Sequence, residues 1–296
     1  MNPTRFIQPE VLSRISSLEL LARGVVEGFI SGLHRSPYKG FSVEFMSYRP
    51  YMPGDDLMHV DWKLFARTDR FYVKEFEDET NTRLHILLDV SGSMEYASGV
   101  VSKRDYASYL AASMAHLMIR QRDAVGLTLF DEAILQRIPP RSTTNHLLLM
   151  LRTLEQMGEG RTSDFGKPLH LLADEFRRRG FMILISDLLG DADALIDGLQ
   201  HFRYNGHEVM VFHILDPQEV QFDFEDMIEF EDMETGEVML VSADAAKELY
   251  LENFTRHQTK LRDACAGMGV DYIPLNTDRP LDAALFNYLA ARSRRT

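Results

Sequence analysis

The sequence has a single cysteine, Cys265, among 296 residues. An internal disulfide is therefore impossible, which is typical of proteins from a reducing cytoplasm. Cys265 falls on the apolar side of a predicted helix, which indicates a small buried residue rather than a reactive thiol. No uninterrupted apolar run approaches the ~20 residues that a transmembrane helix needs, and the segment Met1–Glu10 lacks the order of a signal peptide. We expect a cytoplasmic protein without a membrane span.

Positive charge is also scarce. The formal net charge is -13 and the sequence pI is about 5.2. An acidic chain repels phosphate backbones, so we expect no nucleic-acid partner. The span from Pro217 to Ala246 contains no Lys or Arg and is rich in Asp and Glu. It is either a solvated acidic surface, the simpler interpretation, or a docking surface for a basic partner.

The sequence signatures of common enzymes are missing. The ten histidines include no His-Glu-x-x-His pair, which argues against a zinc hydrolase. His85 and His213 fall in predicted strands, where a structural role is expected. There is no Gly-x-x-x-x-Gly-Lys loop, and the residues around Ser91 do not match Gly-x-Ser-x-Gly. We therefore expect no enzyme activity. A Mg²⁺-dependent phosphohydrolase-like enzyme stays an alternative, although Ser91 stands where such sites often have a second Asp.

Hydrophobic periodicity predicts three segments. Residues 1–33 form an N-terminal helical segment, and residues 34–82 form a small β-rich module with alternating strand patterns. From residue 83 to 296, apolar strands alternate with amphipathic helices, and an acidic hairpin insertion interrupts them at about 217–242. This order predicts an α/β fold: a doubly wound, mostly parallel sheet with helices on both faces.

Polar residues stand where two of the predicted strands end. Asp89 ends an apolar strand and is followed by Ser91 and Ser93, and Asp187 ends a later strand. Thr162 lies in a loop just before a helix. The carboxyl ends of parallel strands form the functional crevice of such sheets. If the two strands are neighbours, we expect all five side chains to converge.

These five side chains offer only hard oxygen ligands. Oxygen-only sites suit Mg²⁺, with Mn²⁺ or Ca²⁺ as alternatives, and disfavour softer metals. An open coordination position on the ion would attract an acidic side chain of another protein. Asp and Ser also favour helix caps and turns, but the matching carboxylate of Asp187 favours a metal site over that interpretation.

The chain resembles two known groups of proteins. Asp89-Val-Ser-Gly-Ser, with Thr162 and Asp187, resembles the metal-ion-dependent adhesion site of von Willebrand factor A domains. The blocks Glu44–Asp56, Val60–Thr68 and Tyr72–Glu79 resemble the DUF58 family, and this resemblance extends over about residues 34–290. It implies a von Willebrand factor A-like fold and a non-enzymatic, metal-dependent protein-binding module. It also implies a partnership, as adaptor or co-factor, with a MoxR-type AAA+ ATPase chaperone.

Two details leave alternatives open. Arg161 precedes Thr162 where such domains often have glycine, so its guanidinium could replace the ion in a scaffold with a vestigial site. Within the β-rich module, a set of charged and aromatic residues is either a partner-docking surface or an internal polar network. Its members are Arg49, Asp55, Asp56, Asp61, Trp62, Lys63 and Arg67.

Overall fold

The computed structural model describes residues 9–15, 17–33, 48–50, 72–74, 83–158, 165–224, 226–231 and 238–293. The chain divides into two compact units. One comprises Met1–Arg35 and Thr82–Thr296, and the other comprises Ser36–Asn81. In the larger unit, the helices of the described part include none with the length and apolar character needed to cross a membrane.

The larger unit is built on a six-stranded sheet with the order β10-β7-β6-β3-β4-β5. Each neighbouring pair is parallel except β4 and β5, which are antiparallel. The predicted doubly wound, mostly parallel sheet is therefore confirmed. The strands are β3 (Arg83–Asp89), β4 (Ala124–Phe130), β5 (Ile134–Arg141), β6 (Phe181–Ser186), β7 (Glu208–Leu215) and β10 (Asp271–Asn276).

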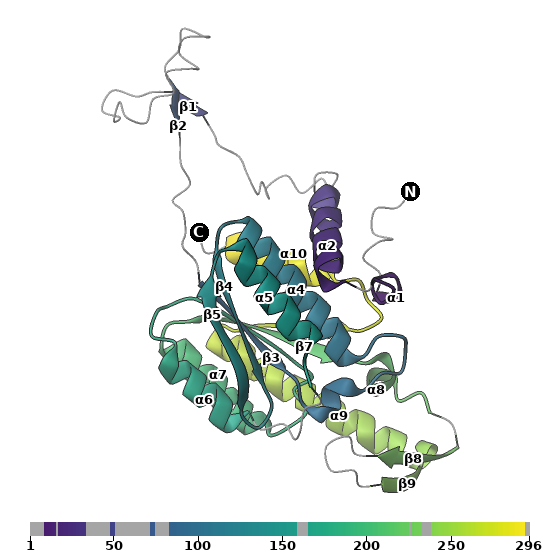
Figure 1. The fold of residues 1–296 in the computed structure, drawn as a ribbon. Helices are drawn as coiled ribbons and strands as arrows, with labels where there is room; N and C mark the ends of the chain where they lie inside the picture. Colours follow the sequence, from purple (N-terminus) through teal and green to yellow (C-terminus); the bar gives the residue numbers. More distant parts are fainter. Residues whose placement is uncertain are drawn as a thin grey trace. The chain divides into compact units, whose positions relative to one another are not determined.

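Helices cover both faces of this sheet (Figure 1). One face carries α4 (Lys103–Arg120), α5 (Thr144–Glu155) and α10 (Asp282–Ser293), and the other carries α6 (Gly166–Glu175), α7 (Ala192–Tyr204) and α9 (Ala243–Met268). The central strands are mostly apolar, as expected for strands that are buried on both faces. Leu87 of β3, Leu184 of β6 and Val211 of β7 form one core with apolar side chains of α6, α7 and α9.

The N-terminal helices belong to the same unit as the sheet. After α1 (Pro9–Leu12), α2 (Leu18–Leu33) packs against α4 and α5. The Leu18 amide donates a hydrogen bond to Glu155 Oε1 at 3.1 Å. This layer extends the helical cover of one sheet face.

The strand β7 leads into the acidic insertion. The insertion begins with the short helix α8 (Pro217–Gln221), which the sequence patterns did not predict. It continues in an antiparallel hairpin formed by β8 (Met227–Glu231) and β9 (Val238–Ser242). The rings of Phe222, Phe230 and Tyr250 pack together, joining the hairpin to α9. The predicted hairpin is therefore present, with its turn outside the described residues.

The smaller unit contains β1 (Tyr48–Pro50) and β2 (Tyr72–Lys74), which pair antiparallel with Arg49 opposite Val73. Both strands fall within the segment that was predicted to be β-rich. The predicted boundaries of that module, 34 and 82, stay predictions.

Candidate metal site

Three aspartates end or directly follow neighbouring strands at the carboxyl edge of the parallel sheet. β3 and β6 are hydrogen-bonded neighbours, with Leu88 opposite Ile185, so Asp89 and Asp187 leave the sheet at the same edge. Asp216 follows the next strand, β7. All three side chains are buried. The two strands are neighbours, and the Asp187 carboxylate lies close enough to influence the charge of Asp89.

Asp89 is fixed by hydrogen bonds to both of its carboxylate oxygens. Oδ1 accepts from the Ser91 amide at 2.9 Å, and Oδ2 accepts from Ser186 Oγ at 2.5 Å. The chain then enters the 3₁₀ helix η3 (Gly92–Glu95), and the hydroxyl oxygens of Ser91 and Ser93 lie 3.1 Å apart. Three of the predicted ligand residues therefore lie at the end of β3 and in the turn that follows it, while Asp187 directly follows the neighbouring strand β6.

The site carries surplus negative charge. Burial, reinforced by the nearby Asp187 carboxylate, raises the pKa of Asp89 to about 7, although hydrogen bonds from Ser186 and Ser91 oppose the shift. Within the described part of the chain, no basic side chain forms an ion pair with Asp89. A positive ion placed beside Asp89 would stabilise its charged form.

A buried lysine lies next to the second carboxylate. Lys103, the first residue of α4, has no exposed surface. Its Nζ donates to Asp187 Oδ2 at 2.7 Å and to Glu219 Oε1 at 2.5 Å. Burial lowers the pKa of Lys103, but the two carboxylates more than offset this effect, so its pKa is raised and the ammonium ion stays charged.

Further hydrogen bonds connect the loop that follows η3 to α8. Glu219 Oε2 accepts from the Asp216 amide at 3.0 Å, which completes a capping box at the start of α8. The Ser98 amide donates to Asp216 Oδ2 at 2.9 Å, and the Tyr96 hydroxyl donates to Gln218 Oε1 at 3.0 Å. The candidate site is therefore continuous with the first element of the acidic insertion.

Sequence reasoning missed four residues of this centre: Lys103, Ser186, Asp216 and Glu219. Ser186 directly precedes Asp187 and is a recognisable strand-end polar residue. Glu219 stands in the pattern Asp216-Pro-Gln-Glu, which is a capping-box signature. Lys103 had no signal, because a lysine in the first turn of a helix is normally solvated.

Several predicted residues lie outside the described part of the chain. They include Thr162 and the neighbouring Arg161, as well as Asp55, Asp56, Asp61, Trp62, Lys63 and Arg67. Arg49 lies in β1, where its backbone alone is described. The roles proposed for these residues stay predictions.

The residues present suit a small, hard cation. Among the described residues, no group of three or more His, Cys, Asp or Glu side chains gathers as a metal site. Among these described residues, an ion at the carboxyl edge would have as donors the carboxylates of Asp89 and Asp187 and the hydroxyls of Ser91 and Ser93. That donor set has only oxygen, which fits Mg²⁺ and related ions and disfavours zinc.

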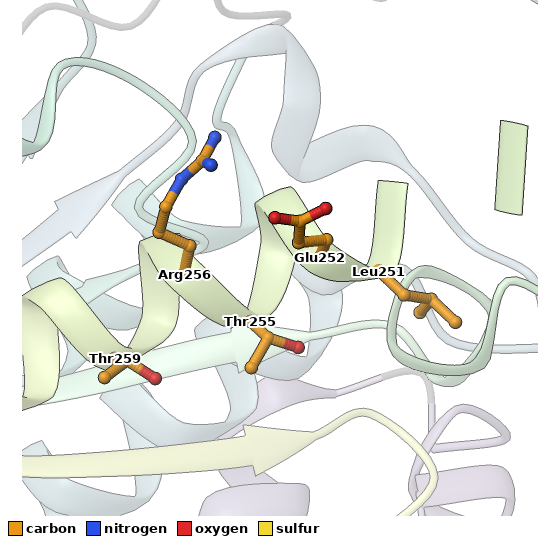
Figure 2. A pocket seen from close by; sticks show the side chains of 5 residues that line it. All are labelled: Leu251, Glu252, Thr255, Arg256 and Thr259. Carbon is orange, nitrogen blue, oxygen red and sulfur yellow. The ribbon is translucent and has the colours of Figure 1, made fainter. Parts of the chain in front are cut away.

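A second surface feature lies along α9. Figure 2 shows the five side chains that line this hollow: Leu251, Glu252, Thr255, Arg256 and Thr259. All five belong to one helix. Binding sites for small molecules usually combine polar groups from several elements, so the carboxyl edge of the sheet is the better candidate.

Comparison with known proteins decides the family. The family model described as "Protein of unknown function DUF58" matches residues 47–260, more than half of the chain. The chain belongs to the DUF58 family. The strand order and the position of Asp89-Val-Ser-Gly-Ser at the end of β3 agree with the von Willebrand factor A-like fold that the sequence resemblance implied.

Individual relatives are distant. An uncharacterized protein of Mycobacterium tuberculosis is 28% identical over 292 residues, covering 97% of this DUF58 chain and 91% of the relative. Among solved structures, BatB from Bacteroides thetaiotaomicron is 14% identical with a TM-score of 0.47, covering 72% of this chain and 99% of that one. The SpRpn10 VWA domain is 15% identical with a TM-score of 0.40, covering 70% and 94%.

Proposed function

We propose that this DUF58 protein is a metal-dependent protein-binding module without catalytic activity of its own. The observation that carries the proposal is the buried pair Asp89 and Asp187, which lies beside the adjacent hydroxyls of Ser91 and Ser93. Mg²⁺ bound here, with Mn²⁺ or Ca²⁺ as alternatives, would supply an electrophilic position for an acidic side chain of a partner protein.

The chemistry of these side chains supports a role in binding an ion. Asp89 and Asp187 supply the negative charge, while the neutral hydroxyls of Ser91 and Ser93 add oxygen without adding charge. The hydrogen bonds from Ser186 and from the Ser91 amide orient the Asp89 carboxylate. Such second-layer contacts are typical of metal sites, because they hold the ligands in position before the ion arrives.

The same geometry gives little support for hydrolysis. A nucleophilic serine needs a base within hydrogen-bond distance. The hydroxyl of Ser91 contacts the hydroxyl of Ser93, and no hydrogen bond joins either one to a histidine within the described residues. The proposed partner, a MoxR-type AAA+ ATPase, rests on the family resemblance of the sequence.

The test uses purified protein and a purified MoxR-type ATPase from the same organism. We expect Mg²⁺ binding by calorimetry, and complex formation that is lost with EDTA and in Asp89→Asn. Asp131→Asn is the matched control, because Asp131 is also buried just after a strand, β4, and its Oδ1 accepts from the Ala133 amide at 3.0 Å. This control should bind both Mg²⁺ and the ATPase.

Two results would contradict the proposal. An ATPase complex that survives EDTA and Asp89→Asn would place the interface away from the ion. Wild-type protein that binds no Mg²⁺, Mn²⁺ or Ca²⁺ at millimolar concentration would remove the metal from the mechanism. Loss of ATPase binding in Asp131→Asn as well would show a general structural effect.

A further inference from the structure

Lys103 is distinguished by where its ammonium group lies. It contacts Asp187 at 2.7 Å with side-chain exposures of 0% and 1%. The ion pair between Lys260 and Asp193 has the same length, 2.7 Å, but its side chains are 46% and 76% exposed. Only the first pair lies inside the candidate metal site.

Burying an ammonium ion in a protein interior is energetically unfavourable. Removing it from water is unfavourable, and an apolar side chain of similar volume often gives equal or greater stability. Lys103 is accommodated because Asp187, Glu219 and the ring of Tyr96, 5.7 Å from Nζ, surround the charge. The arrangement points to a role for the charge itself.

We propose that Lys103 is a built-in cation of the candidate site, which competes with a divalent ion for Asp187 and so sets how strongly that ion binds. The inference rests on the proposed function, because it takes Asp187 as a ligand. An ammonium ion bonded to Asp187 Oδ2 neutralises charge that a divalent ion needs. It also repels that ion, and the repulsion is strong in a buried site of low dielectric constant.

Glu219 gives the ammonium group a second partner. When a divalent ion draws Asp187 away, Lys103 keeps its hydrogen bond to Glu219 Oε1, so its charge does not become unpaired. Glu219 also supports the start of α8 through its bond to the Asp216 amide. Ion binding would therefore shift Lys103 from Asp187 towards α8, the first element of the acidic insertion.

The test compares the dissociation constants for Mg²⁺ of purified variants by calorimetry, together with the shift in Tm that Mg²⁺ produces. Lys103→Met should bind Mg²⁺ at least roughly tenfold more tightly than wild type, because a repelling charge is removed. Glu219→Gln should bind more weakly, because Lys103 then depends on Asp187 alone. Lys260→Met, the exposed matched control, should behave as wild type.

The outcomes separate this inference from the proposed function. Equal Mg²⁺ affinity in wild type and Lys103→Met overturns the inference and leaves the metal site intact. Binding by Lys103→Met alone supports the inference and shows that the ammonium ion takes the metal's place in the wild type, against the proposed function. No binding by either protein overturns both.

Loss of folding in Lys103→Met leaves a second arm of the test. Glu219→Gln keeps the ion pair between Lys103 and Asp187 and removes one carboxylate near the surface of the centre. Mg²⁺ affinity that is unchanged or higher in a folded Glu219→Gln protein would overturn the inference.

Discussion

The two ends of the parallel sheet bury titratable groups in opposite ways. At the carboxyl end, Asp187 and Lys103 are buried as charged partners. At the amino end, the ring of His85 stacks on Phe176 with centroids 3.9 Å apart, and His207 Nε2 donates to the Phe176 carbonyl at 2.8 Å. Burial, followed by the charges of His207 and nearby arginines, lowers the pKa of His85 to about 3, so this imidazole is neutral at physiological pH. We call this the neutral end after its buried imidazole.

The two ends show two ways of offsetting the free-energy cost of burying a titratable side chain. A buried charge is tolerated when a partner of opposite charge contacts it, whereas an imidazole can lose its proton and pack as an aromatic ring. The rings of His85 and His207 are accommodated by packing on Phe176 and by the hydrogen bond from His207 to the Phe176 carbonyl. The charged end retains a surplus of carboxylates, which is useful for binding an ion.

The largest effect is expected from breaking the charged end. Asp187→Ala leaves Lys103 with Glu219 as its remaining partner. We expect a loss of about 3 kcal/mol of unfolding free energy, the lower end of the range for breaking a buried ion pair, because Glu219 still offsets part of the ammonium charge. Urea denaturation in EDTA measures it without interference from metal ions.

Asp193→Ala is the matched control for that experiment. It removes the exposed partner of Lys260, and exposed ion pairs contribute about 0–1 kcal/mol. Equal destabilisation by the two substitutions would show that the buried ion pair contributes no more to stability than an exposed one.

The buried imidazole of His85 at the neutral end should make the unfolding free energy depend on pH. The folded-state pKa of His85, about 3, lies below the reference value of 6.5. Its contribution to stability is therefore complete above pH 6.5 and is lost as pH falls towards 3, with a slope of about 1.4 kcal/mol per pH unit.

His85→Phe removes this group and retains an aromatic ring against Phe176. Between pH 6.5 and 5, the unfolding free energy should fall more in the wild type than in the variant. We expect the difference between the two decreases to be roughly 2 kcal/mol. The difference between the two proteins at pH 8, where His85 is neutral in both states, serves as the reference. Parallel curves over the whole range would contradict a buried neutral imidazole.

The smallest effect is expected from a hydroxyl that supports the charged end. Ser186→Ala removes the donor to Asp89 Oδ2. At pH 8.5, above the pKa of Asp89, it should cost about 1.5 kcal/mol, the lower end of the range for a hydrogen bond to a charged group. Ser113→Ala is the control, because Ser113 is equally buried but donates to the Tyr109 carbonyl. Thermal denaturation at pH 8.5 should give Ser186→Ala a lower Tm than Ser113→Ala. The reverse order would argue that Asp89 is uncharged in the folded protein.

The sequence predicted those features that follow from local patterns. Apolar runs marked the buried strands, and polar residues at their ends placed Asp89 and Asp187 at one edge of the sheet. Lys103 could not be predicted, because its burial depends on Asp187 and on α8, which lie far away along the chain. The ligand role of Thr162 stays a prediction, as does the presence of the ion.

The prolines of the outer strands limit how this protein can meet its partners. β5 contains Pro139 and Pro140, and its pairing with β4 shifts register, while β10 at the other edge contains Pro274. Proline has no amide hydrogen to donate, so neither edge offers an uninterrupted template for an added strand. A binding protein on this framework is therefore expected to recognise others through its loops and side chains, and not by lengthening its sheet.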